Sequence, residues 1–309
     1  MRRLIMTGGA IFACSLARGQ APDKTLTFDA ATIKPFVQPA GRFMMGRGGR
    51  GGPGSNDPGR IHYNAINLRN LLMTAYDVKD FQVSGPAFLD SERFEVQATM
   101  PPETTKEQFH IMLQNLLAER FKVTTHRETK ELPMYSLVVG KGGPKMKESP
   151  EISAEEAAKE PTMPQVGIGT IKMGPDGFPN MPLPSGGRGG LFMMMTPFGA
   201  RIVGQRQTMQ DLAERLSSVL AKPVTDATAL KQKFDFTLTY SMDGLNNGMM
   251  MPLPPPPPGG GGRGDMPDVE PPVNIFSAVQ SQLGLKLDPK KGPVELLVVD
   301  HAEKTPTEN

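Results

Sequence analysis

The sequence predicts an α+β fold of two internally duplicated β-α-β-β-α-β-β units, joined by long Gly/Pro/Met-rich segments. Apolar residues in residues 60–139 recur with the periods of strands and helices, which predicts one such unit. A weaker copy of the pattern returns between residues 201 and 299 and indicates a repeat. The 34 glycines and 31 prolines gather in blocks between these stretches, so we expect ordered cores separated by flexible segments.

Residues 1–19 have the pattern of a signal peptide. Two arginines precede an apolar run at residues 4–16, and the small residues Ala17 and Gly19 provide a cleavage position. Cys14, the only cysteine, could be a lipid-attachment site, but we favour its removal with the signal. We therefore predict a secreted or periplasmic protein without disulfides.

The charge of the mature chain is nearly balanced. Removal of residues 1–19 takes away Arg2, Arg3 and Arg18, which leaves 31 basic against 32 acidic residues and a net charge of −1. Such a chain has no overall field to attract nucleic acid or an anionic membrane. No later apolar run is long enough for a transmembrane helix, so neither a nucleic-acid partner nor a membrane span is expected.

The first unit is predicted at residues 25–139. A β-like run at residues 25–35 adds a strand to its core, and residues 36–59, rich in Gly, Arg and Pro, form a flexible loop. The Arg-Gly block within that loop, residues 46–52, has two interpretations. We favour a mobile surface loop over a nucleic-acid tether because no basic domain lies beside it.

A strand, a helix and two further strands follow this loop. Residues 60–66 alternate as a strand, and Asn67 can cap a helix whose apolar residues recur at i, i+3 and i+4. Strand-like segments at residues 81–84 and 93–98 are separated by a turn at Gly85-Pro86.

The second helix of the unit begins at a capping box, Thr105-Lys106-Glu107-Gln108. Its apolar stripe runs from Phe109 to Leu117. Residues 121–126 and 134–139 are then expected to pair as a hairpin.

A flexible linker is predicted at residues 140–198, broken by one brief helix near Ser153. The second unit follows at residues 199–302, and residues 303–309 form a tail. Residues 243–272 of this unit are a flexible insertion with five consecutive prolines, which we interpret as a spacer in preference to a polyproline ligand.

The repeat rests on aligned core positions. Arg201-Ile202 matches Arg60-Ile61, and the helix residues that follow align at one constant offset, Met209, Leu212 and Leu216 with Leu68, Leu71 and Ala75. We interpret this agreement as an internal duplication.

No metal site is predicted. The four histidines, at positions 62, 110, 126 and 301, have no partner at helical zinc spacing. His110 lies beside Phe109 in the second helix, and Gln114 occupies the i+4 position where a ligand pair needs His or a carboxylate.

Two groups of residues could act as acid–base pairs. One combines His126 with Glu128 and Glu131, and the other is Asp300-His301-Ala302-Glu303. Each lies at a predicted hairpin or near a terminus, where solvated charges are the ordinary interpretation.

Other chemical motifs lack essential parts. Three carboxylates, Asp90, Glu92 and Glu95, surround Phe94, but strand alternation turns Glu95 outward to solvent. No Gly-x-Ser-x-Gly occurs, and no glycine block continues into Lys-Ser/Thr and a helix. We therefore predict no catalytic, cofactor-binding or metal-binding residues and no cofactor.

The chain resembles an uncharacterised secreted family abundant in soil Acidobacteria of the Solibacter type, a domain of unknown function. The matching segments are residues 28–35, 68–76, 85–94, 117–122, 126–133 and 282–295. Phe88 departs from the family, which usually has Trp there, and a smaller aromatic in the same pocket leaves the expected fold intact. Some relatives carry similar domains behind a membrane zinc peptidase of the β-lactam-sensor kind, which implies extracytoplasmic sensing.

More loosely, each unit looks like the short amino-terminal domain of secretins and TonB-dependent receptors, which dock partners in the periplasm. We favour an exported non-enzymatic module that binds a protein or envelope ligand, because duplicated α+β units offer sheet edges and helix faces. The alternative is an extracellular hydrolase with its active site between the units. A third hypothesis is a structural surface protein that self-associates.

Overall fold

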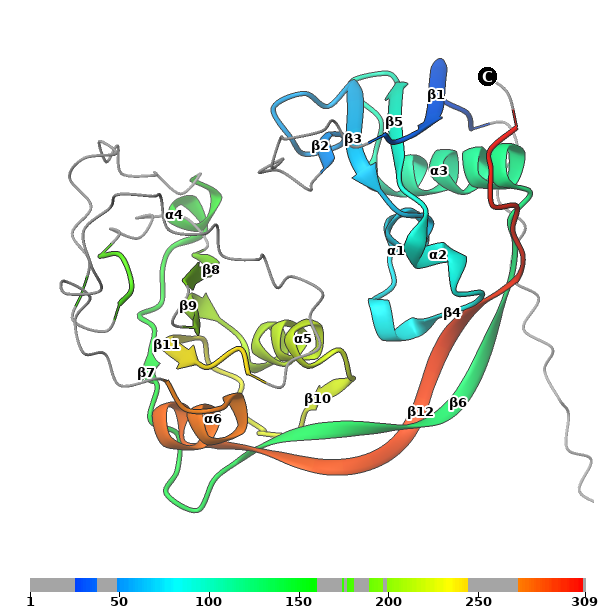
Figure 1. The fold of residues 1–309 in the computed structure, drawn as a ribbon. Helices are drawn as coiled ribbons and strands as arrows, with labels where there is room; N and C mark the ends of the chain where they lie inside the picture. Colours follow the sequence, from blue (N-terminus) through cyan, green and yellow to red (C-terminus); the bar gives the residue numbers. More distant parts are fainter. Residues whose placement is uncertain are drawn as a thin grey trace, which may run out of the picture. The chain divides into compact units, whose positions relative to one another are not determined.

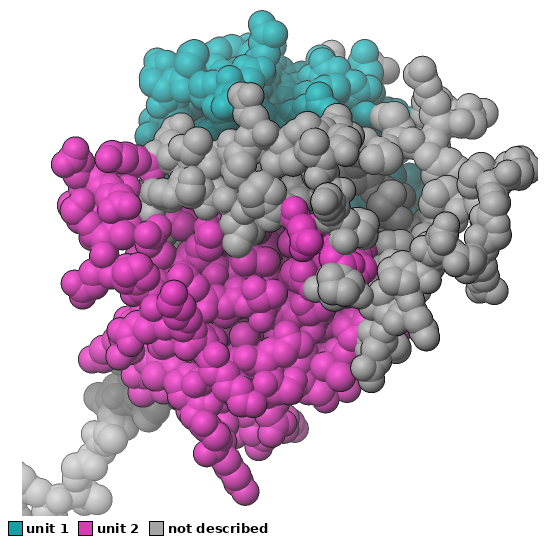
Figure 2. All heavy atoms as spheres, turned by 90° about the vertical axis from the view of Figure 1, so that its left-hand side faces the viewer, with its two compact units in different colours: residues 1–78, 83–128, 296–309 teal, residues 79–82, 129–295 magenta. Residues whose placement is uncertain are grey.

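The computed structural model describes residues 26–37, 49–159, 174, 177–180, 189–196, 199–243 and 272–307. Helices and strands alternate along the chain, which confirms the predicted α+β class (Figure 1). The chain divides into two compact units, which Figure 2 colours separately. Unit 1 comprises residues 1–78, 83–128 and 296–309, and unit 2 comprises residues 79–82 and 129–295. Neither unit is one continuous stretch, so the units differ from the predicted ranges.

Unit 1 contains a four-stranded sheet in the order β1-β5-β3-β2. Its strands are antiparallel and comprise β1 (Ala30–Pro35), β5 (Phe94–Thr99), β3 (Arg60–Ile66) and β2 (Gly49–Gly51). On β5, Phe94, Val96 and Ala98 are buried, as the alternation predicted. The predicted amino-terminal strand is confirmed as β1, whose Ile33 is part of the core.

Strand β2 corrects the prediction of a flexible loop at residues 36–59. The glycines there serve a close approach between strands, since a Cβ on Gly51 would collide with the carbonyl oxygen of Arg60. Gly51 also has a φ of +85°, which favours glycine. Residues 38–48 lie outside the described chain.

Two helices cover the unit 1 sheet, α1 (Leu68–Tyr76) and α3 (Lys106–Phe121). Asn67 caps α1 by accepting a hydrogen bond from the Asn70 backbone N–H, as predicted. The predicted capping box of α3 is also present: the Thr105 side chain accepts from Gln108 N–H, and the Gln108 side chain accepts from Thr105 N–H. The buried faces of both helices join one core.

The segment between these helices differs from the prediction. Residues 81–84 were expected as a strand, but residues Asp80–Gln82 form a 3-10 turn, η1, and only β4 (Val83–Ser84) is extended. The short helix α2 (Phe88–Ser91) was not predicted, and its Leu89 is fully buried. Its single turn is too short to show a helical period.

A second four-stranded sheet has the order β10-β6-β12-β4. Its long strands are β6 (Thr124–Val139) and β12 (Leu285–His301), and β10 (Val224–Asp226) lies at one end. The chain passes from unit 1 to unit 2 within β6, after residue 128, and returns within β12, after residue 295.

The predicted hairpin at residues 121–139 is wrong, because residues 124–139 form one continuous strand. Pro133 lies inside this strand and is tolerated for a geometric reason. The Tyr135 N–H donates towards β10, and a residue two positions earlier directs its backbone groups to the same side. Pairing with β10 begins only at Tyr135, so the N–H that Pro133 lacks is not needed for this pairing.

Unit 2 contains the third sheet, in the order β7-β11-β9-β8. Its strands are β7 (Lys147–Glu148), β11 (Phe234–Tyr240), β9 (Gly199–Gln207) and β8 (Gly190–Thr196). Helices α5 (Met209–Leu220) and α6 (Ile275–Leu283) bury their apolar faces in one core with β9 and β11. A capping box, Thr208 with Asp211, begins α5.

The prediction of a flexible linker at residues 140–198 is wrong for the two segments that form strands of this sheet. Both β7 and β8 lie inside it, together with the expected short helix α4 (Ala154–Ala158) after Ser153. The run Met193 to Met195 resembled linker composition, yet Met193 packs against the core. The signal peptide with Cys14 and residues 244–271 of the insertion lie outside the described residues.

The two halves of the chain share an order of elements. Apart from η1 and α2, which occur only in the first half, that half runs β3, α1, β4, β5, α3, β6, and the second runs β9, α5, β10, β11, α6, β12. Shared order alone does not establish common origin, so the internal duplication stays a prediction.

Candidate functional site

The structure brings together one member from each predicted acid–base group. His126 Nδ1 on β6 lies 2.8 Å from Asp300 Oδ1 on β12. The side chains are 52% and 46% exposed, which places the pair in solvent. Glu131 and His301 are exposed and do not belong to this pair. The backbone N–H of Glu303 donates to the Phe121 carbonyl. The region therefore fits the ordinary interpretation of charged side chains in solvent.

Two of the three carboxylates near Phe94, Asp90 and Glu92, each contact a different basic side chain. Asp90 Oδ1 lies 2.7 Å from Arg69 Nε, and Arg69 also donates to the Val83 carbonyl. Lys304 Nζ lies 3.0 Å from Glu92 Oε1. These contacts fix α1, α2 and the carboxyl-terminal segment to one another, so both acidic residues have structural roles.

Glu95 lies outward, as predicted, and pairs with His62 at 3.2 Å. The Gln97 side chain donates to the same oxygen at 2.7 Å. These hydrogen bonds, that of Gln97 first, lower the pKa of Glu95. A carboxylate held ionised in this way is a poor proton donor near neutral pH.

His110 lines a recess of about 190 Å³ in unit 1. The recess is formed by Gly51, Gly52, Pro53, Asp77, Lys106, Phe109 and His110. Within the described residues no group of three His, Cys, Asp or Glu side chains could hold a metal ion. The recess is also smaller than most ligand sites.

A larger groove, of about 430 Å³, lies in unit 2 beside the outer edge of β11. Its lining residues come from β9, β11, the end of α6 and the segment leading into β7: Lys145, Met146, Lys147, Val203, Gly204, Gln205, Asp235, Phe236, Thr237, Gln282 and Leu283. We call this the β11 groove. Its volume lies within the range of ordinary ligand sites.

The β11 groove exists because strand pairing stops part-way along β11. Strand β7 pairs with β11 only at Phe234 and Asp235. Continued pairing would place Lys145 opposite Thr237, but the Lys145 N–H donates to the Leu283 carbonyl of α6 instead. Among the described residues, no strand pairs with β11 at Thr237, so its edge is open there.

Beyond Thr237, a side chain occupies the edge. Gln282 accepts from the Thr239 N–H at 2.9 Å and donates to the Thr239 carbonyl at 2.7 Å, as a neighbouring strand would. Residues two apart in a strand direct their backbone groups to the same side. The N–H and C=O of Thr237 therefore face the groove, between β7 and the Gln282 amide.

The charged side chains around the groove differ in their hydrogen-bond partners. The Asp235 carboxylate accepts from the Ser149 hydroxyl at 2.6 Å and from the Arg206 N–H at 2.8 Å, where a β-bulge interrupts β9. Lys145 Nζ donates to the Ser281 carbonyl near the end of α6. Lys147 adds a second cation to the rim, which favours a polar or acidic ligand.

Sequence reasoning missed this groove. Its lining combines residues from the predicted linker with Gln282, for which the sequence predicts no role. No motif connects these residues, because an interrupted strand pairing creates the site. A side-chain amide that replaces a strand partner has no sequence signature of its own.

Comparison with known families decides the classification. A family model described as "Protein of unknown function (DUF3738)" matches residues 69–302. The chain belongs to this family. The matched region of this DUF3738 chain includes every residue of the β11 groove and the His126–Asp300 pair. No curated protein and no solved structure matches the DUF3738 chain.

None of the helices in the described residues of the DUF3738 chain is both long and apolar enough to cross a membrane.

Proposed function

We propose that this DUF3738 protein is an exported, non-enzymatic module that binds a protein or envelope ligand in the β11 groove. The observation that supports the proposal is the open backbone edge at Thr237. Added strands bind to such an edge through main-chain hydrogen bonds, while pockets for side chains give specificity. An extended polypeptide segment has the complementary donor and acceptor.

The surroundings of Thr237 favour the same kind of ligand. The Gln282 amide already binds the neighbouring position, Thr239, in the geometry that a peptide group would adopt at Thr237. The two rim lysines, Lys145 and Lys147, suit a segment that carries a carboxylate. A short groove of this kind admits a few residues of a partner.

Export through residues 1–19 and the absence of a nucleic-acid partner belong to the same proposal. Both rest on the amino-terminal pattern and on the balanced charge of the mature chain. Origin in soil Acidobacteria and a likeness to the docking domains of secretins and TonB-dependent receptors remain predictions that agree with a binding role.

The test is a pull-down from an envelope extract with three versions of the mature protein. Thr237→Arg fills the groove with a long side chain. The matched control is Thr225→Arg, the same substitution at an exposed position of β10 outside the groove. We expect partners that bind the unaltered protein and the control but not Thr237→Arg. Equal capture by all three versions would contradict the assignment of the groove.

A hydrolase is the second candidate, and the 2.8 Å contact between His126 and Asp300 is the observation that favours it. In such a pair the carboxylate orients the imidazole, and Nε2 is left to act as a base. If the protein is a hydrolase of this kind, His126→Gln abolishes hydrolysis of an extracellular polymer and leaves the fold intact. The binding proposal expects no hydrolysis by either version.

A further inference from the structure

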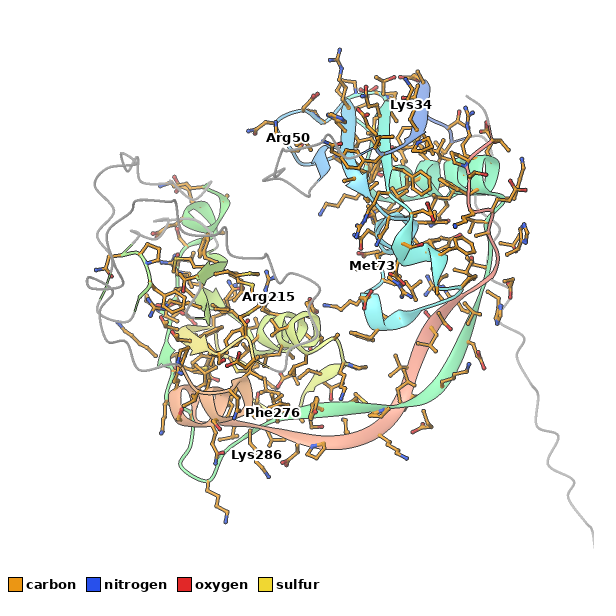
Figure 3. All side chains as sticks on the ribbon, viewed as in Figure 1. Lys34, Arg50, Met73, Arg215, Phe276 and Lys286 are labelled. Carbon is orange, nitrogen blue, oxygen red and sulfur yellow. The ribbon has the colours of Figure 1, made fainter. Side chains whose placement is uncertain are left out.

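The three sheets end on strands of two kinds. End strands β1, β2, β7 and β10 each contain a charged residue, and β4 is only two residues long. Figure 3 shows two of these charges, Lys34 on β1 and Arg50 on β2. Charges and short lengths keep an end strand from pairing with another chain. Strand β8 is different, because its seven residues, Gly-Leu-Phe-Met-Met-Met-Thr, include no charge.

The outward-facing backbone groups of β8 follow from the pairing across the sheet. Thr239 bonds to Gln282, away from β9, so its neighbour Tyr240 bonds to β9 at Ala200. The next residue of β9, Arg201, therefore faces β8 at Met194. The alternation leaves the N–H and C=O of three residues directed away from β9: Leu191, Met193 and Met195.

These outward positions are apolar throughout. Leu191 and Met193 pack against the unit 2 core, and Met195 is 46% exposed. In the described part of the chain the sheet order ends at β8 (Figure 1). Since no further strand of the described sheets pairs with β8, an incoming strand would meet its outward backbone groups and apolar side chains, with no charge to select an acidic or basic partner.

We propose that β8 pairs with β8 of a second copy of this chain, antiparallel about a two-fold axis at Met193. In this register Met193 faces its own copy and Leu191 faces Met195, so each outward residue meets an apolar counterpart. Each facing pair exchanges two hydrogen bonds. The arrangement is self-complementary because the outward residues lie symmetrically about Met193.

A two-fold interface of this kind closes on itself and produces a dimer instead of a filament. The inference goes beyond the proposed binding function. In the sheet order β7-β11-β9-β8, the β11 groove lies at the opposite end from β8. A dimer therefore leaves both grooves open, and a bivalent binder gains avidity for repeated ligands.

The first test compares the mass in solution of three versions of the chain without residues 1–19, by sedimentation velocity. Met195→Pro removes an outward N–H without removing a bond to β9, whereas Met195→Ala shortens the side chain and retains the N–H. We expect the unaltered chain and Met195→Ala to sediment as dimers and Met195→Pro as a monomer. Circular dichroism checks that Met195→Pro is folded.

The second test does not depend on that variant's stability. Removal of residues 1–19 leaves no cysteine, since Cys14 is the only one. Met193→Cys places a thiol on the axis, where facing Cα atoms are about 5.5 Å apart and within disulfide reach. In Met195→Cys the two thiols lie about 13 Å apart along the strands, out of reach.

Mild oxidation should therefore cross-link Met193→Cys into dimers and leave Met195→Cys uncross-linked. Equal cross-linking of the two variants would refute the register. A monomeric unaltered chain at the highest concentration reached, or a folded Met195→Pro that remains a dimer, would overturn the proposal. Because ligand capture by Thr237→Arg is measured separately, failure of the dimer leaves the groove assignment intact.

Discussion

At the scale of single residues, the core of unit 2 contains a polar group with an uncommon environment. Tyr240 is fully buried at the end of β11, and its hydroxyl has no hydrogen-bond partner among the described residues. Burial raises the pKa of Tyr240 to about 12, although the nearby Arg215 opposes the shift. An unsatisfied buried hydroxyl costs free energy that apolar packing elsewhere must offset.

Replacement of Tyr240 by Phe should raise the free energy of unfolding by about 1 kcal/mol, because it removes the unsatisfied hydroxyl. Urea unfolding at neutral pH measures the change. The control is Tyr76→Phe, which should be destabilising because the Tyr76 hydroxyl accepts from Thr125 Oγ1 at 3.1 Å. A loss of stability in Tyr240→Phe would mean that the hydroxyl is satisfied after all.

The same tyrosine should make stability fall in alkali. Its folded-state pKa of about 12 exceeds the value near 10 of an unfolded chain, so the unfolded state loses the proton first. This contribution is fully present below about pH 10 and is lost as the pH rises through about 12. Unfolding curves across that window should show the fall in the unaltered protein, and Tyr240→Phe should show less of it.

Gln282 allows a prediction about the edge of β11. Gln282→Leu leaves the Thr239 N–H and C=O without their partner, and we expect a loss of about 1–3 kcal/mol of unfolding free energy. Gln280→Leu, an exposed position on the same helix, is the control and should change stability little. Similar losses in both variants would show that the amide does not serve as a strand partner.

At the scale of elements, the helix caps carry local stability. The Thr105 side chain accepts a bond from Gln108 N–H at the start of α3. Thr105→Ala should cost about 1 kcal/mol, measured by thermal unfolding, and Thr105→Ser should restore most of it because the hydroxyl is retained. A stable alanine variant with an unstable serine variant would point to packing of the threonine methyl group instead.

Elements whose signals are local could be predicted from sequence, and those that depend on distant pairing could not. Asn67, Thr105 and the alternating Phe94, Val96 and Ala98 act within a few residues of themselves, and the structure confirms them. The continuity of β6 through Pro133 could not be predicted, because it depends on where the distant strand β10 begins. The strand β8 resembled a linker since its apolar residues do not alternate with polar ones.

The candidate site was less predictable than the fold. Sequence reasoning correctly placed Glu95 outward, but it could not join His126 to Asp300, which are 174 positions apart. Thr237 has an ordinary side chain, and its significance lies in a backbone edge that Lys145 leaves open by bonding to Leu283. Chemistry carried by the main chain is not encoded by residue type.

At the scale of the whole molecule, unit 1 depends on residues that come after unit 2. Leu297 and Val299 of β12 are buried in the unit 1 core. The backbone N–H groups of Glu303 and Thr307 donate to Phe121 and Arg120 at the end of α3. The predicted first unit at residues 25–139 therefore lacks part of its own core.

A fragment of residues 20–139 should be unfolded or much less stable than unit 1 in the full chain. Burial of each of the two missing aliphatic side chains contributes about 1.5–3 kcal/mol. Hydrogen exchange of α1 and α3 in the fragment and in the full chain measures the difference. Full protection of both helices in the fragment would show that residues 25–139 fold without β12 and would contradict this prediction.

The late contribution of β12 also sets the order in which this protein can mature. Unit 1 cannot close its core until residues 296–307 have emerged, although its first helix is complete more than 200 positions earlier. Contacts of such long separation slow folding, because a long loop must close before they form. During synthesis, unit 1 therefore stays incompletely folded until the last residues of the chain have been added.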